Sequence, residues 1–94
     1  MNERIDRSDV RQLFKAILSL KDEKECYDFF EDICTINEVI SLSQRFDVAK
    51  MLREHKTYNE IADETGASTA TISRVNRSLN NGHGSYDVLF ERIK

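Results

Sequence analysis

Small hydroxyl side chains and two arginines gather in the segment that follows Gly66. A glycine tolerates the positive φ of a sharp turn, and Ile72 and Val75 then follow at the spacing of one helix face. The other faces carry small, polar or cationic side chains, namely Ser68, Thr69, Ala70, Thr71, Ser73, Arg74 and Arg77. Hydroxyl groups can bond to base edges or bridging waters, a methyl group can touch thymine, and a guanidinium can reach guanine or phosphate. We therefore predict that the helix over residues 68–79 reads the major groove of double-stranded DNA.

Residues 57–79 fit a helix-turn-helix whose second helix is the predicted reading helix. Thr57 and Glu60 have the spacing of a capping box, which starts a short first helix with Ile61 and Ala62 on its inner face. Backbone N–H groups at such a helix start can bind phosphate. The side chains predicted to contact phosphate beside them are Lys56, Tyr58 and Asn59. An alternative interpretation is a helix-turn-helix used as a protein-interaction module without DNA binding.

Apolar stripes with helical spacing predict the elements that must position this motif. Residues 8–20 form one such stripe, capping-box patterns begin two more helices at Asp22 and Thr35, and a last helix covers residues 85–94. The helix that follows Thr35 has the widest apolar face, so we expect it to be the buried centre. The prediction is an all-α fold of about six helices. It is one DNA-binding domain, 1–94, with core and dimerisation helices in 1–54 and a C-terminal packing helix in 85–94.

The first two predicted helices offer more apolar surface than one small core can absorb. Their stripes contain Val10, Leu13, Phe14, Ile17, Leu18, Phe29, Phe30 and Ile33. A second copy of the chain would cover the excess, so we expect a homodimer. A two-fold axis would also present two reading helices to successive major grooves, about 34 Å apart.

The charge of the chain is unevenly distributed. The net charge is −3 and the pI is near 5.4, which argues against a nucleic-acid partner and favours the interaction-module alternative. Residues 26–44, however, carry four acidic and no basic side chains, whereas residues 45–56 carry four basic and two acidic ones. Residues 66–81 carry two arginines and no acid. Positive potential is therefore concentrated around the predicted reading helix.

Residues 64–79, with the sequence ETGASTATISRVNRSL, resemble the Trp repressor superfamily, in particular its YerC/YecD group. The similarity consists of a glycine, an alanine-threonine-isoleucine run, an arginine and a serine-leucine pair. Upstream, the spacing of Thr35, Glu38, Leu42 and Arg45 is similar to the family's helix that closes over the effector. The resemblance covers residues 33–79 and implies an intertwined, all-helical homodimer that represses transcription.

The resemblance also implies an effector site. In the Trp repressor, two arginines sandwich the indole of bound tryptophan and a serine helps to hold its polar end, which implies Arg45, Arg74 and Ser78 here. Alignment of Arg45 requires a one-residue gap, and without the gap Gln44 takes its place. The family has glycine directly after the second arginine, whereas this chain has Val75, whose branched side chain would occupy the slot. We therefore expect no cofactor and absent or weak binding of L-tryptophan; an effector of another kind stays an alternative.

Other functional classes find little support in the sequence. His55 and His83 lack metal-ligand spacing with each other or with a cysteine, and no glycine-rich phosphate loop or nucleophile elbow is present, so neither a metal site nor an enzyme is expected. Cys26 and Cys34 are about 12 Å apart along one predicted helix, which is too far for a disulfide between them. We therefore expect two free thiols, buried as is usual for cysteines in a reducing compartment. Without an apolar run of membrane length or a signal peptide, the expectation is a cytoplasmic protein.

Overall fold

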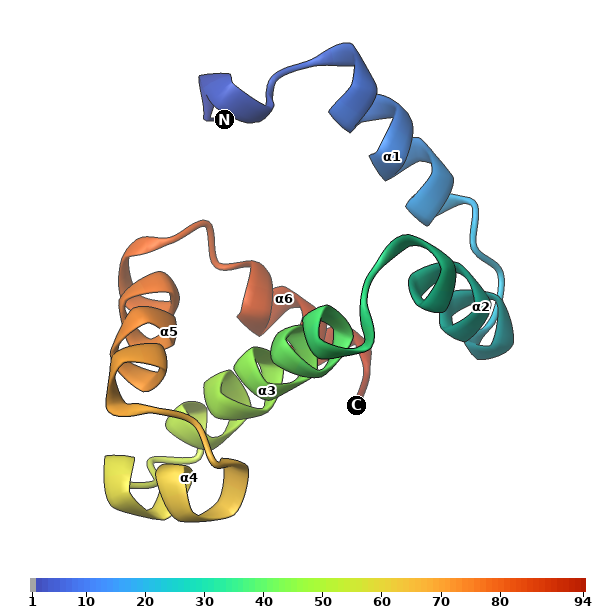
Figure 1. Cartoon of the computed structure of the whole chain (residues 1–94). Helices are drawn as coiled ribbons and strands as arrows, with labels where there is room; N and C mark the ends of the chain where they lie inside the picture. The colour runs from blue at the N-terminus through green and yellow to red at the C-terminus, as the bar shows by residue number, and fades with distance from the viewer. Residues whose placement is uncertain (1) are drawn as a thin grey trace. The chain divides into compact units, whose positions relative to one another are not determined.

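The computed structural model describes residues 2–94, which contain six α-helices and no β-strand (Figure 1). The elements are the short 3-10 helix η1 (Glu3–Ile5), α1 (Ser8–Leu18), α2 (Glu23–Ile33), α3 (Ile36–Arg53), α4 (Tyr58–Thr65), α5 (Thr69–Asn81) and α6 (Ser85–Arg92). The chain has no proline, which would otherwise break helices of this length. The predicted all-α class is confirmed. No helix in the described residues combines the length and apolar character needed to cross a lipid bilayer.

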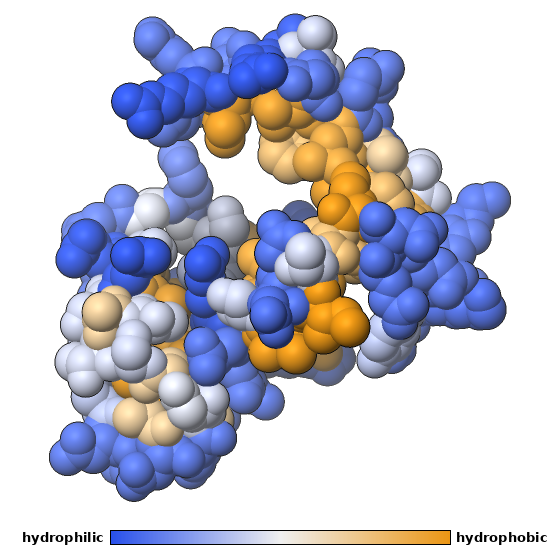
Figure 2. All heavy atoms as spheres, viewed as in Figure 1, coloured by the Kyte–Doolittle hydropathy of each residue, from blue (hydrophilic) through white to orange (hydrophobic). Residues whose placement is uncertain are grey.

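The chain divides into two units, one that ends at Thr35 and one formed by Ile36–Lys94. In the first unit, α1 and α2 each carry an apolar stripe, but neither helix contains a fully buried residue. Leu18 is 84% exposed and Phe14 and Ile33 are about half exposed. Figure 2 shows apolar side chains along one side of these helices and hydrophilic ones on the other. Cys26 is also exposed, so the prediction of two buried thiols is wrong.

The second unit contains the hydrophobic core. Helices α4 and α5 pack against α3 and against each other, and α6 packs against α3. The buried side chains of the described residues are Val48, Ala49, Ile61, Ala67, Ile72, Val75 and Leu79. Met51, Leu52, Tyr58, Ala62, Tyr86 and Phe90 pack against this cluster from its edge. The core therefore unites the second half of α3 with both helices of the predicted motif.

The expectation that the third helix is the buried centre of the fold is confirmed for its second half and is wrong for its first half. Val48 and Ala49 have no exposed surface, whereas Ile36, Ile40 and Leu42 are between about half and three-quarters exposed. The physical reason is that α4 and α5 lie against the C-terminal half of α3 (Figure 1). The first half therefore presents apolar side chains without a cover inside this unit.

A left-handed residue ends α3, and a set of aromatic contacts joins α6 to α3. His55, with φ 63°, closes the end of α3: its N–H donates to the Leu52 carbonyl and the Lys56 N–H donates to the Met51 carbonyl, each at 3.1 Å. This is the hydrogen-bond pattern of a Schellman motif, in which a left-handed residue reverses the chain. Aromatic contacts then hold α6 on α3, with ring centroids of Phe46 and Phe90 4.9 Å apart and those of Phe46 and Tyr86 6.1 Å apart.

Candidate nucleic-acid interface

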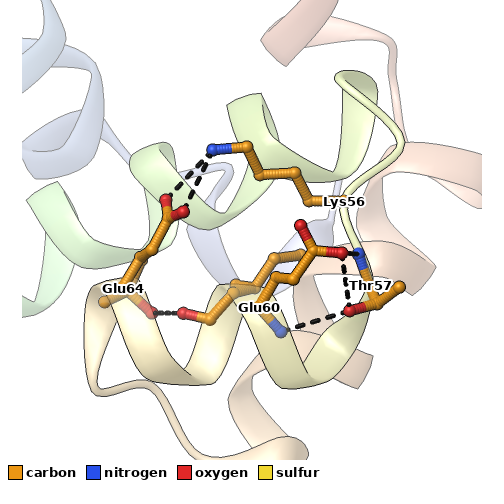
Figure 3. A network of polar contacts seen from close by, with 6 residues as sticks. Lys56, Thr57, Glu60 and Glu64 are labelled. Atoms are coloured by element: carbon orange, nitrogen blue, oxygen red, sulfur yellow. Dashed lines mark hydrogen bonds and ion pairs between the residues drawn. The ribbon is translucent and has the colours of Figure 1, made fainter.

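The first helix of the motif begins at the predicted capping box, which is confirmed. The Glu60 N–H donates to Thr57 Oγ1 at 3.2 Å, and the Thr57 N–H donates to the Glu60 carboxylate at 3.3 Å (Figure 3). Two of the backbone donors at the start of α4 are thereby satisfied by side chains. The buried Ile61 then anchors the helix in the core. The orientation of α4 is thus set by its cap and by the packing of Ile61, with Tyr58 and Ala62 beside it, against the core.

The turn between α4 and α5 has the geometry that Gly66 predicts. Gly66 has φ 73° and ψ 6°, in the left-handed region, and its N–H donates to the Ala62 carbonyl at 2.8 Å. Thr65 Oγ1 accepts from the Ala67 N–H at 3.1 Å, and the Thr65 carbonyl accepts from the Gln44 side chain at 3.1 Å. The turn is therefore hydrogen-bonded both to itself and to α3.

The reading helix α5 has two chemically distinct sides. Ser68 caps its start by accepting from the Thr71 N–H at 3.1 Å, and Ile72, Val75 and Leu79 bury its inner side. Of the residues predicted to face DNA, five are exposed, namely Ser68, Thr69, Ala70, Arg74 and Arg77, and two are half-buried, namely Thr71 and Ser73. No acidic residue occurs in α5. The helix therefore presents a continuous surface of hydroxyl, methyl and guanidinium groups.

The three residues predicted to contact phosphate differ in their surroundings. Asn59 is exposed, Tyr58 is half-buried against the core, and Lys56 forms an ion pair with Glu64 at 3.0 Å (Figure 3). The hydrogen bond that Lys56 donates to the Glu64 carboxylate raises the pKa of Lys56, and Glu54 and Glu60 add to this effect through their charges. A DNA phosphate would have to share the Lys56 ammonium with Glu64.

The residues implied for an effector site all lie on the second unit. Arg45, Arg74 and Ser78 are exposed, whereas Gln44, the alternative to Arg45, is half-buried and donates to the Thr65 carbonyl. Val75 is only 3% exposed and belongs to the core cluster together with Val48 and Ala49 of α3. The branched side chain that was expected to fill a slot beside Arg74 is thus packed among residues of α3 and α5.

The sequence did not predict the contacts of Arg53, which entered the sequence analysis only as one of the four basic residues of 45–56. Its guanidinium forms an ion pair with Asp87, 34 residues further along the chain, and also contacts the end of α5. No local spacing rule connects positions so far apart. The one available signal was the lack of a basic residue in the last turn of α5.

Comparisons with known proteins agree with this geometry. A family model described as Trp repressor protein matches residues 8–94. The uncharacterised protein YerC of Bacillus subtilis (strain 168) is 56% identical over 92 residues, which are 98% of this chain and 88% of YerC. The crystal structure of a TrpR-like protein from Eubacterium eligens ATCC 27750 aligns with a TM-score of 0.95 and 70% identity, over 98% of this chain and 95% of that one. The crystal structure of a candidate Trp repressor from Staphylococcus aureus aligns with a TM-score of 0.93 and 50% identity. The alignment covers 97% of this chain and 91% of that one. The family is regulatory, not enzymatic.

Proposed function

Because the chain belongs to the Trp repressor family, we propose that it is a sequence-specific DNA-binding regulator that represses transcription. The observation that supports this proposal most directly is the exposed side of α5. Thr69, Ala70 and Arg74 lie on a helix whose opposite side is buried in the core, so the polar side faces outward and carries no bulky apolar group. Such a helix suits the major groove, where close approach is needed to read base edges.

Different parts of the motif have different proposed roles. The hydroxyl groups of Thr69, Thr71 and Ser73 and the methyl group of Ala70 read base edges, directly or through water. Arg74 and Arg77 bind guanine or phosphate. The start of α4, with Asn59, Tyr58 and Lys56, lies on the phosphate backbone. The acidic residues of 26–44 lie in other helices, so the net charge of −3 does not describe this surface.

We propose that the working form is a homodimer. The uncovered apolar side chains include Phe14, Leu18 and Ile33 of the first unit and Ile36 and Ile40 of α3. Such surface is unfavourable in water, and a second copy would bury it. Two copies would also provide the paired reading helices that successive major grooves require. Action on chromosomal DNA then requires a cytoplasmic location.

The packing of Val75 supports DNA binding that does not depend on L-tryptophan. The valine side chain already occupies space between α3 and α5, and no ligand is needed to fill the core behind the reading helix. Arg45 and Ser78 are then available to solvent or to DNA rather than to an indole ring.

Selection of bound fragments from random double-stranded DNA by the purified protein tests the proposal. The expected result is an enriched, two-fold symmetric sequence with half-sites one helical turn apart. Affinity for that sequence should fall steeply with salt, with a slope of about −0.9 for each neutralised phosphate. The absence of enrichment, together with salt-insensitive weak binding, would contradict the proposal and favour the protein-interaction module that the acidic pI suggests.

A further inference from the structure

Arg53, in the last turn of α3, lies between the ends of two other helices. Its Nε donates to Asp87 Oδ1 at 2.8 Å and its Nη2 donates to Asp87 Oδ2 at 2.9 Å. The two hydrogen bonds form a bidentate guanidinium–carboxylate contact. The same Nη2 donates to the backbone carbonyl of Leu79 at 3.3 Å. The hydrogen bonds that Arg53 donates to the Asp87 carboxylate raise the pKa of Arg53. One side chain therefore connects α3, α5 and α6.

The contact with Leu79 compensates for a feature of α5 itself. The last carbonyls of a helix have no partners inside the helix and carry partial negative charge, which a cation stabilises. The last turn of α5 contains no basic residue, and its cap, Gly82, donates only to the Ser78 carbonyl. Arg53 supplies from α3 the cation that α5 lacks. Because the Leu79 side chain is buried in the core, the contact is made at a fixed point.

The other end of the contact is also fixed. Asp87 lies in the first turn of α6, and Tyr86 and Phe90 on either side of it pack with Phe46 of α3. The aromatic cluster thus holds the carboxylate in place, and the carboxylate orients the guanidinium toward α5. The position of the C-terminal end of the reading helix depends on this chain of contacts.

We propose that Arg53 is a positioning residue for DNA recognition, which sets the direction of α5 by holding its C-terminal turn. This role rests on the proposed function. Arg53 acts through α5 and makes no contact with DNA itself. Its effect is therefore on how well the exposed side of α5 fits the groove, and not on the number of phosphates that the protein neutralises.

The test compares Arg53→Gln, Asp87→Asn and the full-length wild-type protein on the DNA sequence that the wild type selects. Arg53→Gln should weaken binding roughly fivefold per half-site, the size of a helix-end charge effect. Asp87→Asn keeps the Arg53 donor to Leu79 but removes the carboxylate charge that orients the guanidinium, so it should weaken binding about twofold, less than Arg53→Gln does, while it lowers the urea midpoint. Arg92→Gln removes an equal charge from the exposed end of α6 and should leave affinity unchanged. Equal losses in Arg53→Gln and Asp87→Asn would overturn the assignment to Leu79.

The salt dependence of binding separates positioning from direct contact. The slope of log affinity against log salt should be the same for Arg53→Gln and the wild type, whereas loss of a phosphate contact would reduce it by about one. A reduced slope would therefore overturn the positioning role. Arg53→Lys retains the charge but not the planar fork, and its affinity should be intermediate; it also serves if Arg53→Gln does not fold.

Failure of this inference and failure of the proposed function give different results. If the wild-type protein selects no DNA, the proposed function is wrong and the role of Arg53 falls with it. If the wild type binds selected DNA and Arg53→Gln binds it within twofold, only the role of Arg53 is overturned.

Discussion

Gly66 provides a sharp test of how the two helices of the motif are joined. Its φ of 73° lies in a region that L-residues enter at a cost of about 1–2 kcal/mol, while a Cβ built on Gly66 has no heavy atom within 4 Å. Gly66→Ala therefore introduces backbone strain without a steric clash. His55 shows that a side chain can adopt this region in the same protein, at φ 63°.

The expected loss of stability can be worked out from these terms. Alanine also restricts the unfolded chain, which returns about 0.4–1 kcal/mol. The net loss should therefore be about 1 kcal/mol, or roughly 4–8 °C in Tm for a domain of this size. Asparagine tolerates the left-handed region better, so Gly66→Asn should lose less than Gly66→Ala.

Urea unfolding followed by circular dichroism, at one fixed protein concentration, measures these differences. Gly84→Ala is the matched control, because Gly84 has φ 75° and also has no heavy atom within 4 Å of an added Cβ. Gly84→Ala should lower the free energy of unfolding by a similar amount, although Gly84 lies outside the helix-turn-helix. Gly82→Ala would destabilise the protein by a steric clash instead of backbone strain. The φ of Gly82 is an ordinary −88°, but an added Cβ would lie 2.4 Å from the Ser78 carbonyl oxygen, so the end of α5 must shift.

Two results would refute this reasoning. A loss above about 3 kcal/mol in Gly66→Ala would mean that the added methyl group meets atoms that the structure places elsewhere. An unchanged urea midpoint in both Gly66→Ala and Gly84→Ala would mean that neither glycine adopts the left-handed conformation in solution.

Further predictions concern DNA, the dimer and the effector. Lys56→Ala should weaken binding to all DNA sequences alike in a filter-binding assay, and a change in sequence preference would contradict its assigned role. Thr71→Val or Arg74→Ala should cost about 1–3 kcal/mol of specific binding and alter the sequence selected, whereas a uniform loss would show that neither reads bases. Leu18→Glu should shift the mass measured by sedimentation from dimer toward monomer, and an unchanged mass would exclude that side chain from the interface. Calorimetry with L-tryptophan should detect no binding in the micromolar range, and micromolar binding would contradict the argument from Val75.

Local sequence signals predicted much of the fold because they act over a few residues. The Thr57–Glu60 capping box and the Gly66 turn each depend on neighbours within one helical turn, and both are present in the structure. At Asp22 only half of the predicted box forms, since the Glu25 carboxylate accepts from the Lys21 N–H instead. Helix starts are therefore predictable even where the exact partner is not.

Features that depend on distant segments were not predictable. The contact between Arg53 and Asp87 requires knowledge of how α6 returns to α3, which no spacing pattern contains. The burial of α3 was overestimated because its apolar face is continuous in sequence, while α4 and α5 cover only one half of it. The two sides of α5 were separable, because helical periodicity alone divides the core side chains from the exposed ones. Periodicity did not anticipate that Thr71 and Ser73 are half-buried.

All buried side chains of the described residues fall between Val48 and Leu79, the segment that also contains the proposed reading surface. Stability and recognition thus share the same helix but use opposite sides of it. Substitutions at Thr69, Ala70 or Arg74 can accumulate without disturbing the interior. Paralogues or engineered variants can therefore acquire new operator preferences on an unchanged fold. Substitutions at Ile72 or Leu79 would instead destabilise the fold, and selection would remove them whatever their effect on DNA recognition.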